Sequence, residues 1–150
     1  MNERWLDKVG DIVALSKSVS EADIALYGLI SRDDAFVPED PTPPQRQPRQ
    51  MAPYPFLASL LAAAAAYPVS LPAQASFRWQ QVEFSAPMYT DDTLYMTVEI
   101  VAFDEVARTI DVSVNCQNQD QQRLAHGTFT LDVSAVEPAD NSRHASAEDV

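Results

Sequence analysis

Apolar positions in the second half of the chain recur every two residues, as expected for strands with one buried face. Three such runs cover residues 94–102, 110–116 and 125–133, and a fourth strand is expected over Ser76–Phe84. We expect these segments to form four consecutive antiparallel strands, a long meander with one apolar face. The expected inward positions are Leu94, Met96, Val98, Ile100, Ala102, Ile110, Val112, Val114, Cys116, Ala125, Gly127, Phe129, Leu131 and Val133.

Two helices are predicted before these strands. Ser18-Val-Ser20-Glu21 is a capping-box pattern, and the apolar spacing that follows predicts a short helix over residues 21–31. Residues 56–67 are alanine-rich and apolar on every side, so we expect a second helix that is buried on every side. Pro55 suits the first turn of that helix, where a missing N–H does no harm.

Two segments lack such periodicity. Seven of the eleven prolines lie between Pro38 and Pro55. Since each proline removes a backbone donor and restricts the residue before it, we expect a loop without helix or strand over residues 38–55. A loop of this length is usually either a functional lid or disordered. The polar residues 134–150 are expected to form a flexible tail.

These elements favour one α+β domain over residues 1–133, in which an antiparallel sheet wraps around the apolar helix at 56–67. The length of 150 residues allows one ordinary core, and 46% apolar with 21% charged residues is a globular composition. Wrapping is the economical way to bury both the helix and the apolar face of the sheet.

The net charge of −12 excludes several partners. A nucleic acid or an anionic membrane surface must be met by clustered Lys and Arg, which an acidic chain lacks. The apolar residues 56–67 are too few to cross a bilayer, which takes about 20. The first residues carry charges and no apolar signal segment, so we expect a cytoplasmic protein. A single cysteine, Cys116, excludes an internal disulfide, and no Cys/His cluster predicts a metal; we expect no cofactor.

Basic residues exceed acidic ones only between residues 41 and 90, where Arg46, Arg49 and Arg78 face Glu83 alone. An anionic ligand would best meet this part of the chain. The alternative is that these are three ordinary solvated side chains.

Four pieces in order resemble the MaoC-like branch of the hotdog fold, which contains (R)-specific enoyl-CoA hydratases and acyl-thioester dehydratases. Residues 9–11 and 18–24 resemble its opening strand and first helix. Ala58-Ser59-Leu60 resembles the start of its central helix, and residues 84–94 resemble its FxxPVxxGDxL motif, with Asp91 where glycine is usual. The resemblance extends from about residue 8 to residue 133. It implies a dimer with joined sheets and an acyl-thioester tunnel between subunits.

The hydratase motif of that family reads roughly S-G-D-x-N-P-x-H, and this chain departs from it. The alignment places Asp33 on the aspartate, but Ala35 on the asparagine and Pro38 on the catalytic histidine. The family's His-Gly before the central helix becomes Pro53-Tyr54. Asp33 and the helical serine, Ser59, keep their expected identities.

Hydration of an enoyl thioester needs a base for the water, an acid for the α-carbon and donors for an enolate-like oxygen. Pro38 cannot exchange a side-chain proton, so Asp33 would act alone or paired with Asp34 or Glu39, whose proximity would raise one pKa. The alternative is a solvated acidic turn.

The oxyanion donors would be backbone N–H groups at the start of the central helix, at Tyr54 and Phe56. Since Pro53 and Pro55 have none, Tyr54 N–H is the best donor. The resemblance implies that Ser59 orients Asp33; the alternative is that it only caps and packs.

Three functional hypotheses follow. The first is an acyl-thioester hydratase or dehydratase with catalytic residues Asp33, Tyr54 and Ser59, in which Arg46, Arg49 or Arg78 bind the phosphates of CoA or of a carrier protein's phosphopantetheine. The second is a catalytically silent subunit that forms a heterodimer with an intact hotdog chain. The third is a non-catalytic binding or regulatory module that uses the same pocket for an acyl thioester. The expected assembly is a homodimer or a heterodimer with another hotdog subunit.

Overall fold

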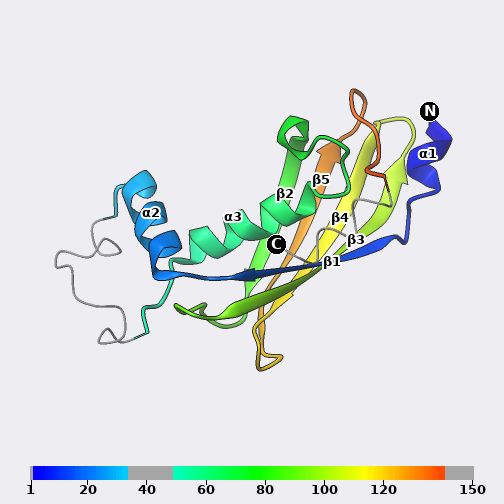
Figure 1. The fold of residues 1–150 in the computed structure, drawn as a ribbon. Helices are drawn as coiled ribbons and strands as arrows, with labels where there is room; N and C mark the ends of the chain where they lie inside the picture. The colour runs from blue at the N-terminus through cyan, green and yellow to red at the C-terminus, as the bar shows by residue number, and fades with distance from the viewer. Residues whose placement is uncertain (1, 34–48, 141–150) are drawn as a thin grey trace.

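Five antiparallel strands form one sheet in the order β1-β3-β4-β5-β2 in the computed structural model, which describes residues 2–33 and 49–140 (Figure 1). The strands are β1 (Ile12–Ser18), β2 (Ser76–Phe84), β3 (Thr93–Asp104), β4 (Thr109–Gln117) and β5 (Arg123–Asp132). The helices are α1 (Asn2–Leu6), α2 (Glu21–Ser31) and α3 (Tyr54–Ala65), with a short 3-10 helix η3 (Pro72–Gln74). The predicted α+β fold class is confirmed.

The predicted four-strand meander is only partly correct. β3, β4 and β5 follow one another as expected, but β2 does not pair with β3. It lies at the far edge of the sheet, beside β5, while β1 takes the place next to β3. Alternating residues identify which face of a strand is buried and contain no information about which strand is its neighbour.

The inward positions are buried as predicted, with one exception. Ala102 is exposed, and Phe103 packs against the core in its place. The pairing of β3 with β4 shifts register between Ile100 and Ala102. Such a bulge adds one residue to the strand and so reverses the alternation beyond it.

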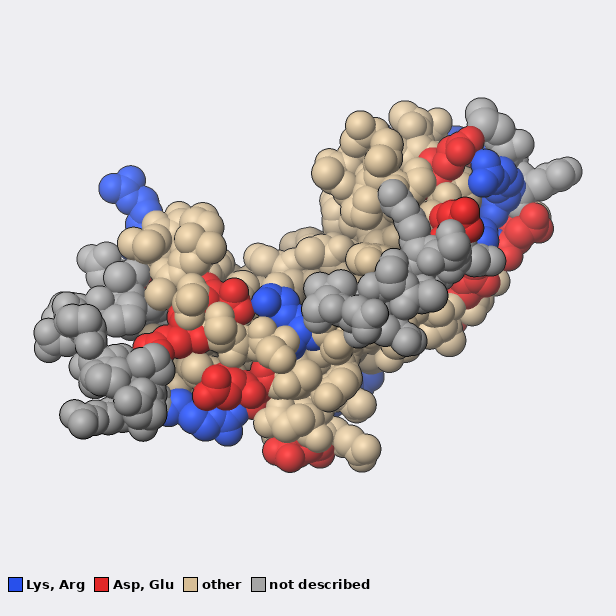
Figure 2. Space-filling view, in the orientation of Figure 1, with Lys and Arg blue, Asp and Glu red and all other residues tan. Residues whose placement is uncertain are grey.

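α3 lies along the inner face of the sheet and packs against β3, β4 and β5 (Figure 1). It begins and ends two residues before the predicted range, and the expectation that it is buried on every side is wrong. The sheet buries one face, whose members include Leu57 and Leu61, and leaves Pro55, Ser59 and Ala63 exposed one turn apart. In Figure 2 the surface over α3 is mostly uncharged. One sheet can cover only one side of a helix, so the other side of α3 is open in the single chain.

α2 covers the predicted residues 21–31, but its N-cap lies two residues after Ser18, where the predicted capping box begins. Ser20 is the N-cap: its hydroxyl accepts from Asp23 N–H, and Asp23 Oδ2 accepts from Ser20 N–H, both at 3.0 Å. Ser18 instead ends β1. Asp23, at the third helical position, thus accepts the capping-box hydrogen bond that the sequence pattern assigned to Glu21.

Residues 134–139, which we assigned to a flexible tail, lie against other parts of the chain. Ser70 N–H donates to Glu137 O at 2.8 Å, and Ala139 N–H donates to Pro68 O at 2.7 Å. The indole of Trp5 on α1 is buried and donates to Val136 O at 3.3 Å. The packed part of the chain therefore reaches Ala139; residues 141–150 lie outside the described residues.

Candidate functional site

α2, the first turn of α3 and the end of β2 are joined by aromatic contacts. Tyr27 stacks on Phe56 with ring centroids 5.0 Å apart, and Tyr54 meets Phe84 edge to face, also at 5.0 Å. In Figure 1 the start of α3 and α2 occupy the same end of the molecule. α2, which Asp33 follows, thus contacts the first turn of α3, which begins at Tyr54, through Tyr27 and Phe56.

The start of α3 offers a backbone donor. Pro53 is the N-cap and forms no side-chain cap, Pro55 has no N–H, and Phe56 N–H donates to Pro53 O at 3.0 Å. Within the described part of the chain, no group accepts a hydrogen bond from Tyr54 N–H. The helix dipole adds partial positive charge at this end. The first turn is therefore suited to an oxygen that gains negative charge.

Asp33 follows the end of α2. Arg32 has a left-handed backbone (φ 62°), and Asp33 N–H donates to Gly28 O at 2.9 Å, which fixes the backbone at this point. The Asp33 side chain is exposed. Asp34, Pro38 and Glu39 lie outside the described residues, so the carboxylate pair stays a prediction.

Ser59 lies on the exposed stripe of α3. Its hydroxyl donates to Pro55 O, 2.9 Å away and one turn earlier on the same helix. The proposed orienting of Asp33 by Ser59 also stays a prediction.

Both described candidate arginines pair with carboxylates; Arg46 lies outside the described residues. Arg49 pairs with Asp92, donates from Nε to Thr90 O at 3.1 Å and stacks over Tyr89. Arg78 on β2 bonds Asp132 at 2.6 Å. Hydrogen bonds from Ser134 and from Arg78 hold the pKa of Asp132 below its usual range.

Asp92 is not among the residues predicted from the sequence. Its carboxylate is 2% exposed and accepts hydrogen bonds from Tyr89 N–H at 2.8 Å and Gln119 Nε2 at 3.0 Å, besides the pair with Arg49. The only signal was its place in the motif-like residues 84–94, which says nothing about burial. Across the described ranges, no cluster of His, Cys, Asp and Glu is arranged to hold a metal ion.

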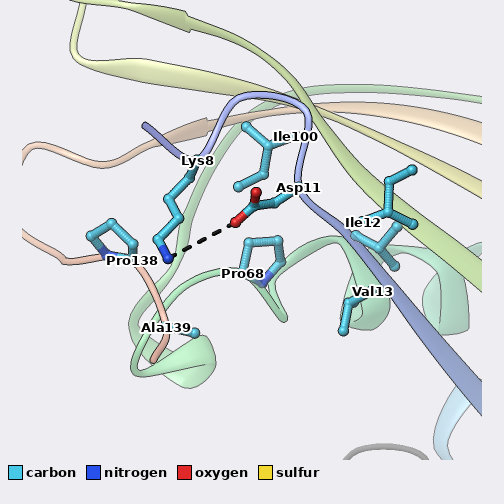
Figure 3. Close-up of a pocket in the computed structure, with 9 residues that line it drawn as sticks. Lys8, Asp11, Ile12, Val13, Pro68, Ile100, Pro138 and Ala139 are labelled. Carbon is cyan, nitrogen blue, oxygen red and sulfur yellow. Dashed lines mark ion pairs between the residues drawn. The ribbon is translucent and has the colours of Figure 1, made fainter. Parts of the chain in front are cut away.

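A small cavity lies at the other end of α3 (Figure 3). It leaves about 10 Å³ for the centres of water molecules, room for about one water. Lys8 and Asp11, 3.9 Å apart, lie at its edge, and Pro68 and Val98 are among its apolar walls. Pro68 follows the C-terminal end of α3, so this cavity does not belong to the candidate site, and it is too small for an acyl chain.

Cys116 is predicted to be chemically inert in the native protein. Its side chain is buried on the inner face of β4, and burial raises the pKa of the thiol to about 12. Since the thiolate is the nucleophile, iodoacetamide at pH 8 should leave the folded chain unlabelled and label the urea-unfolded chain fully. Labelling at similar rates in both states, followed by mass spectrometry, would show that the thiol is accessible.

Comparison with known proteins identifies the fold. No family model matches the chain, and no curated protein matches its sequence. The unliganded R-hydratase PhaJ1 from Pseudomonas aeruginosa superimposes with a TM-score of 0.69 at 18% identity, covering 91% of this chain and 86% of that chain. The ChsH1-ChsH2 complex from Mycobacterium tuberculosis gives 0.61 at 20% identity, covering 83% of this chain and 96% of that chain.

A third structure extends the range of neighbours. A hypothetical thioesterase protein with coenzyme A from Streptococcus pneumoniae gives a TM-score of 0.58 at 15% identity, covering 89% of this chain and 87% of that chain. These similarities extend over most of each chain. The chain has the hotdog fold, as the sequence resemblance implied.

No helix in the portion of the chain that the structure describes has the length and apolar character needed to cross a membrane.

Proposed function

We propose that this hotdog chain is a MaoC-like protein that binds an acyl thioester and acts on it as a hydratase or dehydratase. The observation that carries the proposal is Tyr54 N–H at the start of α3, which has no acceptor among residues 2–33 and 49–140, on the helix that contacts α2. Tyr54 N–H is suited to the thioester oxygen, and Asp33, which follows α2, is suited to proton transfer. Hydratases and CoA-binding proteins among the neighbours support the substrate class.

In the proposed reaction the thioester carbonyl accepts a hydrogen bond from Tyr54 N–H. Asp33 takes a proton from water as the water oxygen bonds to the β-carbon of the enoyl group. The electron pair of the double bond moves toward the carbonyl, where the dipole of α3 stabilises the enolate-like charge. Asp33 then returns the proton to the α-carbon, so that water is added without any other reactant.

We propose that a second hotdog subunit completes the site. β2 is an open edge of the sheet, and Phe77, Trp79 and Phe84 on it are 40%, 52% and 42% exposed. An open strand edge with large apolar side chains is a surface for pairing with another chain. A partner there would also lie beside the uncovered stripe of α3, which would give an acyl chain an apolar slot. Of the three arginines predicted to contact the phosphates of CoA or of a carrier protein's phosphopantetheine, Arg46 and Arg78 stay proposed contacts, and Arg49 is already engaged by Asp92, Thr90 and Tyr89.

The alternative function is a silent subunit or a binding module. The observation that favours it is Pro38, which stands where the resemblance expects the catalytic histidine. One of the similar solved structures is a complex of ChsH1 with ChsH2, which supports a partner that differs from this chain. In that case the chain would bind the thioester, and an intact hotdog partner would supply the acid and base.

Hydration of crotonyl-CoA by the purified chain tests the proposal. Asp33→Asn should lower kcat by about 100-fold or more, because asparagine keeps the shape of the side chain and cannot accept the proton. Loss of the enoyl thioester absorbance measures the rate, and Asp104→Asn at the end of β3 is the matched control.

Unchanged turnover in Asp33→Asn would contradict the catalytic role. Binding of crotonyl-CoA without any turnover by the wild-type chain would favour the silent subunit. Addition of an intact hotdog partner would then be expected to restore hydration.

A further inference from the structure

The buried carboxylate of Asp92 ties together segments that are distant in sequence. It accepts from Tyr89 N–H within its own loop, from Gln119 on the β4–β5 turn and from Arg49, which follows the proline-rich residues. Asp92 is 2% exposed, whereas the side chain of Arg49 is 54% exposed. Asp92 is thus a fixed acceptor, and Arg49 reaches it from the surface.

Every residue from Arg49 to Ala52 is attached to the loop that precedes β3. Gln50 N–H donates to Thr90 Oγ1 at 3.2 Å, and Thr90 N–H donates to Gln50 O at 2.8 Å. Met51 pairs with Tyr89, and Ala52 N–H donates to Met88 O at 2.7 Å. Pro53 and Tyr54 come directly after residues 49–52. The position of Tyr54 N–H therefore depends on how firmly residues 49–52 are held.

The same loop holds the start of α2. Val19 N–H donates to Asp92 O, and Asp91 N–H donates to Val19 O, both at 2.8 Å. Val19 directly precedes Ser20, the N-cap of α2. The loop around Asp92 thus bonds to two segments. One is Val19, just before α2, the helix that Asp33 follows. The other is residues 49–52, just before α3, where Tyr54 lies.

We propose that the Arg49–Asp92 pair is a positioning element of the candidate site, which sets Tyr54 N–H relative to the end of α2. This inference rests on the proposed function and assigns to Arg49 a role other than binding substrate phosphates. The Arg49 guanidinium already donates to Asp92 and to Thr90 O and stacks over Tyr89. Displacing an oxyanion donor by about 1 Å can lower the rate by about 100-fold. The Arg49–Asp92 pair can therefore affect catalysis without contacting the substrate.

Arg49→Gln tests the proposal, with Arg4→Gln as the matched control. Arg4 also forms an ion pair with a carboxylate, Glu137, but on α1 at the other end of the molecule. The first readout needs no ligand: amide hydrogen exchange at residues 52–57 and 19–24. Arg49→Gln should speed exchange there by about 10-fold, and Arg4→Gln should not.

The second readout compares crotonyl-CoA with crotonyl-pantetheine, which lacks the nucleotide and its phosphates. A positioning role predicts that Arg49→Gln lowers kcat by a similar factor, about 10-fold, for both substrates. Arg49→Lys, which keeps a positive charge facing Asp92, should recover part of the kcat that is lost in Arg49→Gln. If the wild-type chain binds the two thioesters without turnover, their dissociation constants are compared between the variants in place of kcat.

Two results would overturn the proposal. One is unchanged amide exchange at residues 52–57 in Arg49→Gln. The other is a loss that appears only with crotonyl-CoA as a raised KM, because that would make Arg49 a phosphate contact. If neither thioester binds to the wild-type chain, the proposed function fails, and amide exchange alone decides whether Arg49 holds the start of α3.

Discussion

Replacing Phe129 by alanine is expected to lower the free energy of unfolding by about 3–5 kcal/mol. The Phe129 ring is fully buried on β5 and meets the edge of Phe77 with centroids 6.1 Å apart. It also covers Gly127, where an added Cβ would lie 2.5 Å from the ring and 3.4 Å from Leu61 of α3. The ring thus lies where Leu61 of α3 faces β5, and its removal would leave a cavity there. Urea unfolding followed by circular dichroism measures the loss.

Tyr95→Ala is the control for this experiment. Tyr95 is an aromatic residue of a central strand, but it is 47% exposed on the other face of the sheet. We expect a loss of about 1 kcal/mol or less from this change. Equal losses in the two variants would contradict the packing of α3 against β5.

The second large effect is expected for Asp92→Ala, at about 3 kcal/mol of unfolding free energy. The change removes one acceptor from three donors: Tyr89 N–H, the Gln119 amide and the Arg49 guanidinium. Arg49 can turn to water, whereas Tyr89 N–H lies in the partly buried loop before β3 and its bond to Asp92 is made within that loop. Urea unfolding again provides the measurement.

Glu137→Ala provides the comparison for Asp92→Ala. Glu137 also pairs with an arginine, but both side chains are more than half exposed, at 59% for Arg4 and 55% for Glu137. Exposed pairs of this kind contribute about 0–1 kcal/mol. If Asp92→Ala costs no more than Glu137→Ala, Asp92 does not organise the loop.

The sequence predicted the faces of the strands better than their order. Alternation placed Val112, Val114 and Phe129 correctly in the core, because burial of one face imposes a period of two. The place of β2 beside β5 depends on β1 occupying the edge of β3, which no local pattern encodes. The exposure of Ala102 depends on a bulge, which is equally invisible in the alternation.

The exposed side of α3 has a related cause. Its apolar residues predicted burial on every side, and that prediction was wrong for a single chain. Ser59 and Ala63 face away from the sheet, where the proposed second subunit would cover them. Apolar composition indicates that a helix surface is suited to burial, but it does not show whether the same chain or a second chain buries it.

For the candidate site, the resemblance predicted Asp33 and Tyr54, but the pair of Arg49 with Asp92 was not found. These two residues are 43 positions apart. Among 22 acidic residues, nothing in the composition separates one buried carboxylate from the solvated ones. The distinction arises only when residues 49–52 pair with the loop before β3.

In the proposed function, Tyr54 N–H donates a hydrogen bond to the carbonyl of an acyl thioester. This hydrogen bond is tested most directly by the amide resonance of Tyr54 in the labelled protein during titration with crotonyl-CoA, with CoA alone as the control. We expect a large downfield shift of the Tyr54 amide proton with crotonyl-CoA and little change with CoA. Saturable binding that leaves the Tyr54 amide unmoved, or no binding of crotonyl-CoA at all, would contradict this role of Tyr54 N–H.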